Sequence, residues 1–303
     1  MNEPFDLSVE YAGVKFKNPV ITASGTFGSG REYSEFFDLN ILGGVTVKGV
    51  SLRAWPGNRP PRVAETYGGM LNSIGLQNPG VDYFIKEDVP FLKKFDVKII
   101  VNVWGHTADE YAEVAERLAD SGVDLIELNV SCPNIKDGGL AFGTNCDTLY
   151  EVVSKTKKKA RQPVVVKLSP NVTDIVSIAR AAEAAGADGL SLINTLLGMK
   201  IDIHKKKPAL ANVMGGLSGP AIKPVAVRMV YQVSRAVKIP VIGIGGIMTG
   251  ADAVEFFMAG AKLVAIGTAF FNDPFAAVNV LGGIKDFMGF NGYKKINEIP
   301  VIK

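Results

Sequence analysis

Cys132 is the residue of this sequence best suited to act as a base or a nucleophile. It stands in the stretch Asn129 to Asn134, between the apolar run Val123 to Leu128 and the glycine-rich segment Asp137 to Gly143. A cysteine inside an apolar run is usually a small buried hydrophobe. Cys132 follows the run, in a Ser-Cys-Pro-Asn turn, where a thiol with an ordinary pKa of about 8.5 can act as a base. We therefore expect a reactive thiol where a strand ends.

Other polar and glycine residues follow further apolar runs in the same way. Amides and lysines at such positions suit a planar, hydrogen-bonding, partly anionic ligand. The two histidines, His106 and His204, belong to no carboxylate or imidazole cluster, so we expect no metal site. The residues at the predicted strand ends are Ser24, Lys48, Asn102, Asn129, Lys167, Asn194, Thr195, Gly245, Gly246, Gly267 and Thr268.

The last two predicted strand ends are rich in glycine and lead toward helices. Backbone N–H groups there can hold a phosphate near the positive end of a helix dipole. The alternative is that the glycines only permit tight turns, but two such ends in succession favour a phosphate site. Lys48 and Lys167 have an alternative as well, in which their side chains reach solvent.

These residues must be positioned by apolar runs that alternate with helical patterns about eight times. The clearest helix has a capping box at Thr107 to Glu110, an apolar face through Tyr111 and Leu118, and a stop at Gly122. Strands that are almost wholly apolar predict a parallel sheet buried on both faces. We expect an α/β fold, one (β/α)8 TIM barrel spanning residues 1–303. The predicted strands are Val20–Ala23, Val45–Val47, Ile99–Val101, Leu125–Leu128, Val164–Val166, Leu190–Ile193, Val241–Ile244 and Leu263–Ile266.

An open dinucleotide-binding sheet is the other architecture considered. It is disfavoured because Gly243 to Gly246 lacks the last glycine of the G-x-G-x-x-G pattern, Met248 standing there instead. Residues Leu7 to Phe16 alternate around Gly13 and predict a β-hairpin that caps one end of the barrel.

Insertions are expected after strands 2, 4 and 6. The segments Ser51 to Asn78 and Leu196 to Gly219 interrupt the rhythm and are predicted to be long loops without secondary structure, on the catalytic face. The third insertion is the loop Ile135 to Gly143. Cys146 is expected near a helix start, in a structural role.

Composition limits the class of protein. The net charge of +3 gives no reason to expect nucleic acid, and the basic run Lys155 to Arg161 is predicted to be the solvated end of a helix. No apolar run reaches the roughly 20 residues of a membrane span. Two cysteines cannot form a disulfide framework or ligate an ordinary iron-sulfur cluster. With nothing resembling a signal peptide, a cytoplasmic protein is expected.

Several motifs, in order along the chain, resemble the dihydroorotate dehydrogenase family. The resemblance runs from about Leu7 to the last helix. It is carried by Asn129-Val130-Ser131-Cys132-Pro133-Asn134, Lys48-Gly49, Asn72-Ser73-Ile74-Gly75-Leu76-Gln77-Asn78, Asn194-Thr195, Gly216-Leu217-Ser218-Gly219-Pro220 and Gly243-Ile244-Gly245-Gly246-Ile247.

The resemblance implies an FMN-dependent oxidation of (S)-dihydroorotate to orotate in pyrimidine biosynthesis. Cys132 would take the proton from C5 while a hydride passes from C6 to flavin N5. The substrate would be bound by Lys48, Asn72, Ser73, Ile74, Gly75, Leu76, Asn129, Asn194 and Thr195. FMN would be bound by Ser24, Lys48, Gly49, Asn102, Asn129, Lys167, Ile193, Gly219, Gly245, Gly246, Gly267 and Thr268.

Cysteine rather than serine at position 132, together with the lack of an N-terminal membrane segment, is similar to the soluble class 1 enzymes of the family. The loop Ile135 to Gly143 is similar to that of the class 1B catalytic subunit. The resemblance then implies a second chain that carries FAD and a 2Fe-2S cluster and passes electrons to NAD, with a homodimer of this chain inside a heterotetramer. One departure concerns Trp104 and His106, where smaller residues would be expected and packing under the flavin would be altered.

Four alternatives remain open from the sequence. One is a class 1A-like homodimer that uses fumarate, and another is a related dihydropyrimidine enzyme. A flavin-free barrel lyase or isomerase would act on a sugar phosphate through a Schiff base on Lys167. A non-catalytic module that binds a phosphate ligand would not depend on Cys132.

Overall fold

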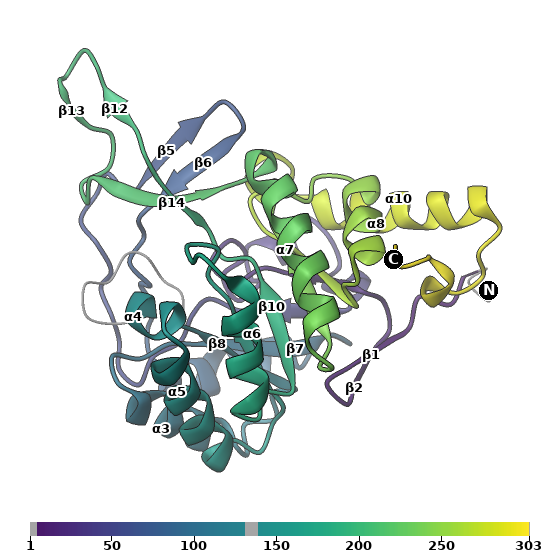
Figure 1. Cartoon of the computed structure of the whole chain (residues 1–303), viewed down its shortest axis with the longest axis horizontal. Helices are drawn as coiled ribbons and strands as arrows, with labels where there is room; N and C mark the ends of the chain where they lie inside the picture. The colour runs from purple at the N-terminus through teal and green to yellow at the C-terminus, as the bar shows by residue number, and fades with distance from the viewer. Residues whose placement is uncertain (1–4, 131–138, 303) are drawn as a thin grey trace.

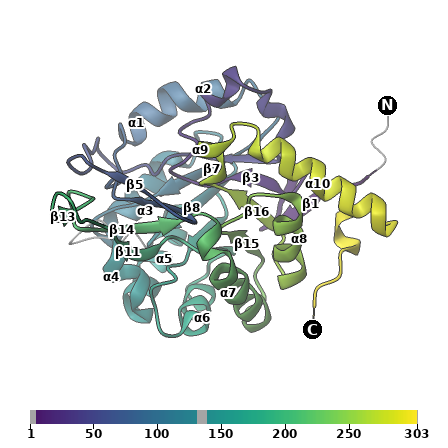
Figure 2. The ribbon, with the colours of Figure 1, turned by 90° about the horizontal axis from the view of Figure 1, so that it is seen from above.

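The computed structural model describes residues 5–130 and 139–302. Eight parallel strands close into a barrel, and they follow one another around the ring in the order in which they occur in the chain. Figure 2 shows the ring with helices around its outside. This confirms the predicted (β/α)8 barrel. The barrel strands are β3 (Val20–Thr22), β4 (Gly44–Thr46), β7 (Lys98–Val103), β8 (Leu125–Asn129), β9 (Val164–Lys167), β10 (Gly189–Leu192), β15 (Val241–Ile244) and β16 (Leu263–Ile266).

The helices cover the barrel with apolar faces at helical spacing. In α3 the buried face includes Tyr111, Val114 and Leu118, so one stripe packs on the sheet while the other side meets solvent. The long helices are α3 (Ala108–Leu118), α5 (Cys146–Lys159), α6 (Ile175–Ala184), α7 (Lys223–Ala236), α8 (Gly250–Ala259) and α10 (Ala276–Asn291). The short ones are α1 (Val81–Tyr83), η3 (Phe84–Asp88), α2 (Val89–Leu92), α4 (Gly139–Thr144) and α9 (Ala269–Asn272), with single turns η1 (Tyr33–Glu35), η2 (Leu39–Ile41), η4 (Pro220–Ile222) and η5 (Ile296–Glu298).

The helix ends lie where the sequence predicts them, but the predicted capping box of α3 needs one correction. Thr107 accepts a hydrogen bond from the N–H of Glu110, as a capping box requires. The carboxylate of Glu110 accepts from the N–H of His106 rather than from that of Thr107, so the reciprocal half of the box is displaced by one residue. Lys157, Lys158 and Lys159 of the predicted basic run form the last turn of α5, and Arg161 lies just beyond that helix. Cys146 is the first residue of α5, as predicted.

The predicted N-terminal hairpin closes one end of the barrel. Strands β1 (Val9–Tyr11) and β2 (Val14–Phe16) pair antiparallel around Gly13. Tyr11 and Phe16 are fully buried against side chains from the barrel interior, among them Leu125. The hydroxyl of Tyr11 donates to the carbonyl of Leu190 at 2.9 Å. Burial, and then the charges of Glu127 and Asp188, raise the pKa of Tyr11 well above its ordinary value, so the phenol stays protonated.

The insertions after β4 and β10 are not structureless, which corrects the prediction. Together they build a four-stranded antiparallel sheet in the order β11-β14-β6-β5, which we call the insertion sheet. With the β12–β13 hairpin it projects from one end of the barrel (Figure 1). The strands are β5 (Val63–Thr66), β6 (Gly69–Asn72), β11 (Leu196–Met199), β14 (Met214–Ser218), β12 (Ile201–Asp202) and β13 (Lys207–Pro208).

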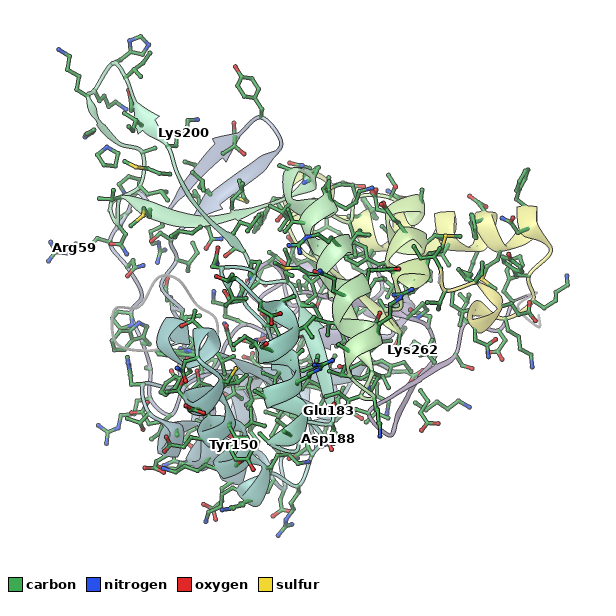
Figure 3. All side chains as sticks on the ribbon, in the orientation of Figure 1. Arg59, Tyr150, Glu183, Asp188, Lys200 and Lys262 are labelled. Carbon is green, nitrogen blue, oxygen red and sulfur yellow. The ribbon has the colours of Figure 1, made fainter. Side chains whose placement is uncertain are left out.

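Pairing across the insertion sheet joins segments that are far apart in the chain. Gly216 of β14 lies opposite Asn72 of β6, and the Nδ2 of Asn72 donates to the carbonyl of Gly216. Lys200, which Figure 3 shows beside β12, donates from Nζ to the carbonyl of Glu65 at 2.8 Å. Short, partly exposed strands with distant partners carry a weak local signal in sequence. The third insertion, after β8, lies partly outside the described residues.

Candidate active site

Inward-facing side chains change from apolar to polar along the barrel axis. Because alternate residues of a strand face the same side, Leu125 near the start of β8 and Asn129 at its end both point into the barrel. Leu125 belongs to the apolar cluster around the hairpin. Asn102 of β7 and Lys167 of β9 are likewise inward and lie beside β8 at the same end as Asn129. The carboxyl ends of the strands therefore form the polar end of the barrel, where (β/α)8 enzymes hold their sites.

A cavity opens at this end, and nearly all of the residues selected from the sequence line it. The insertion sheet also contributes to it, through Val63, Met70 and Asn72. The selected residues in the lining are Ser24, Lys48, Gly49, Asn72, Ile74, Gly75, Leu76, Asn102, Asn129, Lys167, Ile193, Asn194, Thr195, Gly219, Gly245, Gly246, Gly267 and Thr268.

Two of the selected residues are not in that lining. Ser73 is 1% exposed, and both its hydroxyl and its carbonyl accept hydrogen bonds from Nδ2 of Asn58 at 3.1 Å. Its side chain therefore holds the neighbouring loop rather than facing the cavity. Cys132, the predicted base, lies outside the described residues.

The two lysines give the cavity a positive charge. Lys167 is 4% exposed, and its Nζ donates to Oγ of Ser24 at 3.1 Å. The alternative in which Lys167 extends to solvent is therefore wrong. Lys48 is half-buried and lines the cavity, and a methyl group added at Gly25 would lie 3.7 Å from its Nζ. Because the described lining contains no carboxylate, the cavity favours an anionic ligand.

A row of hydrogen-bonded amides runs along one wall. Nδ2 of Asn194 donates to Oδ1 of Asn129 at 3.2 Å, and Nδ2 of Asn129 approaches Oδ1 of Asn102 at 3.5 Å. Nδ2 of Asn102 then donates to Oε1 of Glu127 at 2.7 Å. Each amide is thus fixed in orientation by its neighbour, which suits recognition of a planar ring that carries donors and acceptors.

The glycine-rich segment after β15 leaves no room for side chains in its part of the cavity wall. A Cβ at Gly246 would lie 2.7 Å from Cβ of Lys223 and 3.0 Å from the carbonyl oxygen of Gly219. A Cβ at Gly245 would lie 2.9 Å from Cβ of Ala226. Backbone therefore forms this wall, as a phosphate-binding surface of a barrel requires. Beside it, the hydroxyl of Thr268 donates to Oγ of Ser218 at 2.8 Å.

The structure adds lining residues that the sequence reasoning missed. Val63, Met70 and Ser218 line the cavity from strands of the insertion sheet, Met248 lines it from a loop, and Phe271 lines it from α9. A signal for Ser218 was its place between Leu217 and Gly219 in a motif already selected. Val63 and Met70 had none, because their segment was predicted to be a loop.

Trp104, noted above as a departure from the family pattern, lies behind the cavity wall. It is fully buried, and a Cβ at Gly49 would lie 3.3 Å from its Cδ1. Its ring makes edge contacts with Trp55 and His106 at centroid distances of 5.7 and 5.2 Å. Trp104 therefore supports Gly49 from outside the lining and leaves Asn102 in place.

A family model for dihydroorotate dehydrogenase matches residues 6–288 of the chain. The chain belongs to the dihydroorotate dehydrogenase family. As a member of that family it is an oxidoreductase. Within residues 5–130 and 139–302, no helix has both the length and the apolar character needed to cross a bilayer.

Relatives in the dihydroorotate dehydrogenase family are similar over almost the whole chain. The protein named "Dihydroorotate dehydrogenase B (NAD(+)), catalytic subunit" of Alkaliphilus metalliredigens is 63% identical over 97% of this chain and 97% of its own length. The protein of the same name in Geotalea uraniireducens is 55% identical over 99% of this chain and 98% of its own length. A crystal structure of DHODH from Eimeria tenella in complex with ferulenol has a TM-score of 0.83, covering 99% of this chain and 89% of that one. At 22% identity, this likeness concerns the fold alone.

Proposed function

We propose that this chain catalyses the FMN-dependent oxidation of (S)-dihydroorotate to orotate in de novo pyrimidine biosynthesis. The observation that carries the proposal is the gathering of the amide row, Lys48 and Lys167 around one cavity at the carboxyl ends of the strands. Orotate and dihydroorotate are planar or nearly planar rings with amide groups and one carboxylate, and this set of donors, acceptors and positive charge complements them. The names of the relatives support the same reaction.

The residues present fit FMN. The backbone wall at Gly245 and Gly246 suits its phosphate, because no side chain fits there and backbone can approach closely. Lys167 and the row of amides suit the polar edge of its ring. When bound, FMN supplies a two-electron acceptor for the hydride from C6, at N5. The residues proposed to hold it are Ser24, Lys48, Gly49, Asn102, Asn129, Lys167, Ile193, Gly219, Gly245, Gly246, Gly267 and Thr268.

The substrate would lie between the insertion sheet and the amide row. Lys48 would face its carboxylate, and Asn129, Asn194 and Thr195 would bond its ring, together with the segment Asn72 to Leu76. Ser73 of that segment would act through the loop it holds. We assign the removal of the C5 proton to Cys132, which follows the end of β8 in sequence.

The electrons would leave through a second chain. The relatives are named catalytic subunits and their names contain NAD(+), which supports a partner subunit with FAD and a 2Fe-2S cluster that reduces NAD. A homodimer of this chain within a heterotetramer, located in the cytoplasm, completes the proposal. The class 1A-like alternative would use fumarate without such a partner.

The test is an absorption spectrum of the purified chain under anaerobic conditions. We expect flavin bands that bleach when dihydroorotate is added. A chain that takes up no FMN, even after incubation with it, would refute the proposed function. That result would favour the flavin-free barrel enzyme acting on a sugar phosphate, which is tested by borohydride trapping of substrate on Lys167. Rapid reduction of fumarate by the chain alone would refute the NAD-linked assignment.

A further inference from the structure

Glu127 is a buried carboxylate directly beneath the cavity. It is the third residue of β8, is 2% exposed, and is not part of the lining, so it does not reach a ligand. Both of its oxygens are engaged. Oε1 accepts from Nδ2 of Asn102 at 2.7 Å, and Oε2 accepts from the hydroxyl of Ser191 at 2.7 Å. Nζ of Lys167 lies 3.8 Å from Oε1.

The chemistry of a carboxylate determines the direction of the amide row. An ionised carboxylate accepts hydrogen bonds and cannot donate them, so it selects the Nδ2 end of Asn102. Oδ1 of Asn102 must then face Nδ2 of Asn129. Oδ1 of Asn129 in turn faces Nδ2 of Asn194. Asn102, Asn129 and Asn194 all line the cavity. The buried anion therefore fixes which amide atoms remain available to a ligand.

The same carboxylate compensates the charge of Lys167. Both side chains are almost fully buried, where an unpaired charge is costly. Lys167 also donates to Ser24, so its ammonium group is held between one side chain of the lining and one beneath it. With Glu127 present, the field that Lys167 exerts on a ring in the cavity is reduced by an opposite charge close by.

We propose that Glu127 is the positioning residue of this site: it orients the Asn102–Asn129–Asn194 row and lowers the net positive field of Lys167 on the flavin. The proposal rests on the proposed function, because it requires FMN in the cavity. It assigns to Glu127 a role in setting both the affinity for FMN and the flavin reduction potential.

The experiment compares wild-type chain, Glu127→Gln and the matched control Ser191→Ala, each loaded with FMN. In Glu127→Gln the anion is lost and the positive field of Lys167 is uncompensated, which favours the more negatively charged reduced flavin. We expect the ratio of reduced to oxidised flavin at a fixed potential to rise at least tenfold, a shift of about 30 mV to more positive potential for a two-electron couple. Ser191→Ala loses one hydrogen bond to the same carboxylate but keeps its charge, so its ratio should stay within about twofold of wild type.

A second variant, Glu127→Asp, tests orientation separately from charge. It keeps the anion but withdraws it by one methylene group from Asn102. We expect a potential close to that of wild type and an FMN dissociation constant, measured by quenching of flavin fluorescence on the apoprotein, raised at least fivefold. If Glu127→Gln does not fold, this variant still tests the orienting role of Glu127, and an unchanged dissociation constant for FMN would overturn it.

The outcomes separate the two proposals. If wild-type chain binds no FMN, the proposed function fails, and this is seen before any variant is compared. If wild-type chain binds FMN and is reduced by dihydroorotate, but Glu127→Gln titrates at the wild-type potential, or Glu127→Asp binds FMN as tightly as wild type, the role of Glu127 is overturned and the proposed function stands.

Discussion

Replacing Gly246 by alanine should weaken FMN binding while leaving the barrel folded. Gly246 follows β15 with a φ of +75°, a conformation that L-residues adopt at a cost. The new Cβ would lie 2.7 Å from Cβ of Lys223 and 3.0 Å from the carbonyl oxygen of Gly219. It would therefore push the Gly219 segment away from the end of β15, and both belong to the proposed phosphate wall.

The size of the effect follows from two costs. The positive φ costs about 1–2 kcal/mol, and the steric overlap, like other overpacking, costs about 1–3 kcal/mol. The sum of about 2–5 kcal/mol is smaller than the roughly 5–15 kcal/mol by which folded proteins are usually stable. We expect the midpoint of thermal unfolding to fall by about 4–10 °C. Affinity for FMN should fall at least tenfold, or about 1.4 kcal/mol.

The assay pairs thermal unfolding with an FMN titration of the apoprotein followed by flavin fluorescence. Gly282→Ala is the matched control, because Gly282 is exposed within α10 and a Cβ there would meet nothing within 4 Å. It should raise stability by about 0.5–1 kcal/mol and leave FMN affinity unchanged. Wild-type affinity for FMN in Gly246→Ala would refute the placement of the phosphate at this wall.

Two further predictions concern chemistry and pH. Cys132→Ser should retain FMN but slow turnover by roughly 100-fold or more, because a hydroxyl is a poor base near neutral pH; full activity in a steady-state orotate assay would remove Cys132 from the mechanism. Hydrogen bonds to Asp252 and then Glu255, at 2.6 and 2.7 Å, raise the pKa of Lys223 above its ordinary value of 10.5. The stabilisation that goes with a raised lysine pKa is fully present at pH values below the pKa in the unfolded chain. It is lost as the pH rises through the pKa in the folded protein. Urea unfolding should thus show a lower free energy of unfolding for Lys223→Met than for wild type at pH 7, and this difference should narrow above about pH 10.5. A difference that stays constant up to about pH 12 would contradict this.

The barrel, and most of the residues that line its cavity, could be predicted because each apolar strand with its polar end is a local unit of sequence. A run such as Val164 to Val166, apolar throughout and followed by Lys167, indicates a buried parallel strand with a polar end, without knowledge of its neighbours. Closure of the barrel then gathers all such ends on one face. This is why residues as distant in sequence as Ser24 and Lys167 could be assigned to one site. In the structure Oγ of Ser24 lies 3.1 Å from Nζ of Lys167.

The insertion sheet could not be predicted because its stability is not local. The pairing of Gly216 with Asn72 spans most of the barrel in sequence, and strands such as β5 are largely exposed, so they lack a buried face that would create a clear period of two. Val63 and Met70 were missed as lining residues for that reason. The side-chain position of Cys132 remains a sequence prediction, because it lies outside residues 5–130 and 139–302.

Glu127 is a charged residue in a strand whose other positions in the barrel wall are buried, and this exception bears on function. Its strand, Leu125 to Asn129, is buried at every position, and a carboxylate there must leave water, which costs several kcal/mol for each ion of a buried pair. Replacing such a pair with well-packed apolar side chains is often neutral or stabilising, so the stability of the barrel alone does not explain why Glu127 and Lys167 are charged. Both charges lie at the end of the barrel that opens into the cavity, and one of them lines it. The departure from the apolar pattern is therefore best explained by the ligand that the cavity holds, for which the barrel gives up part of its stability.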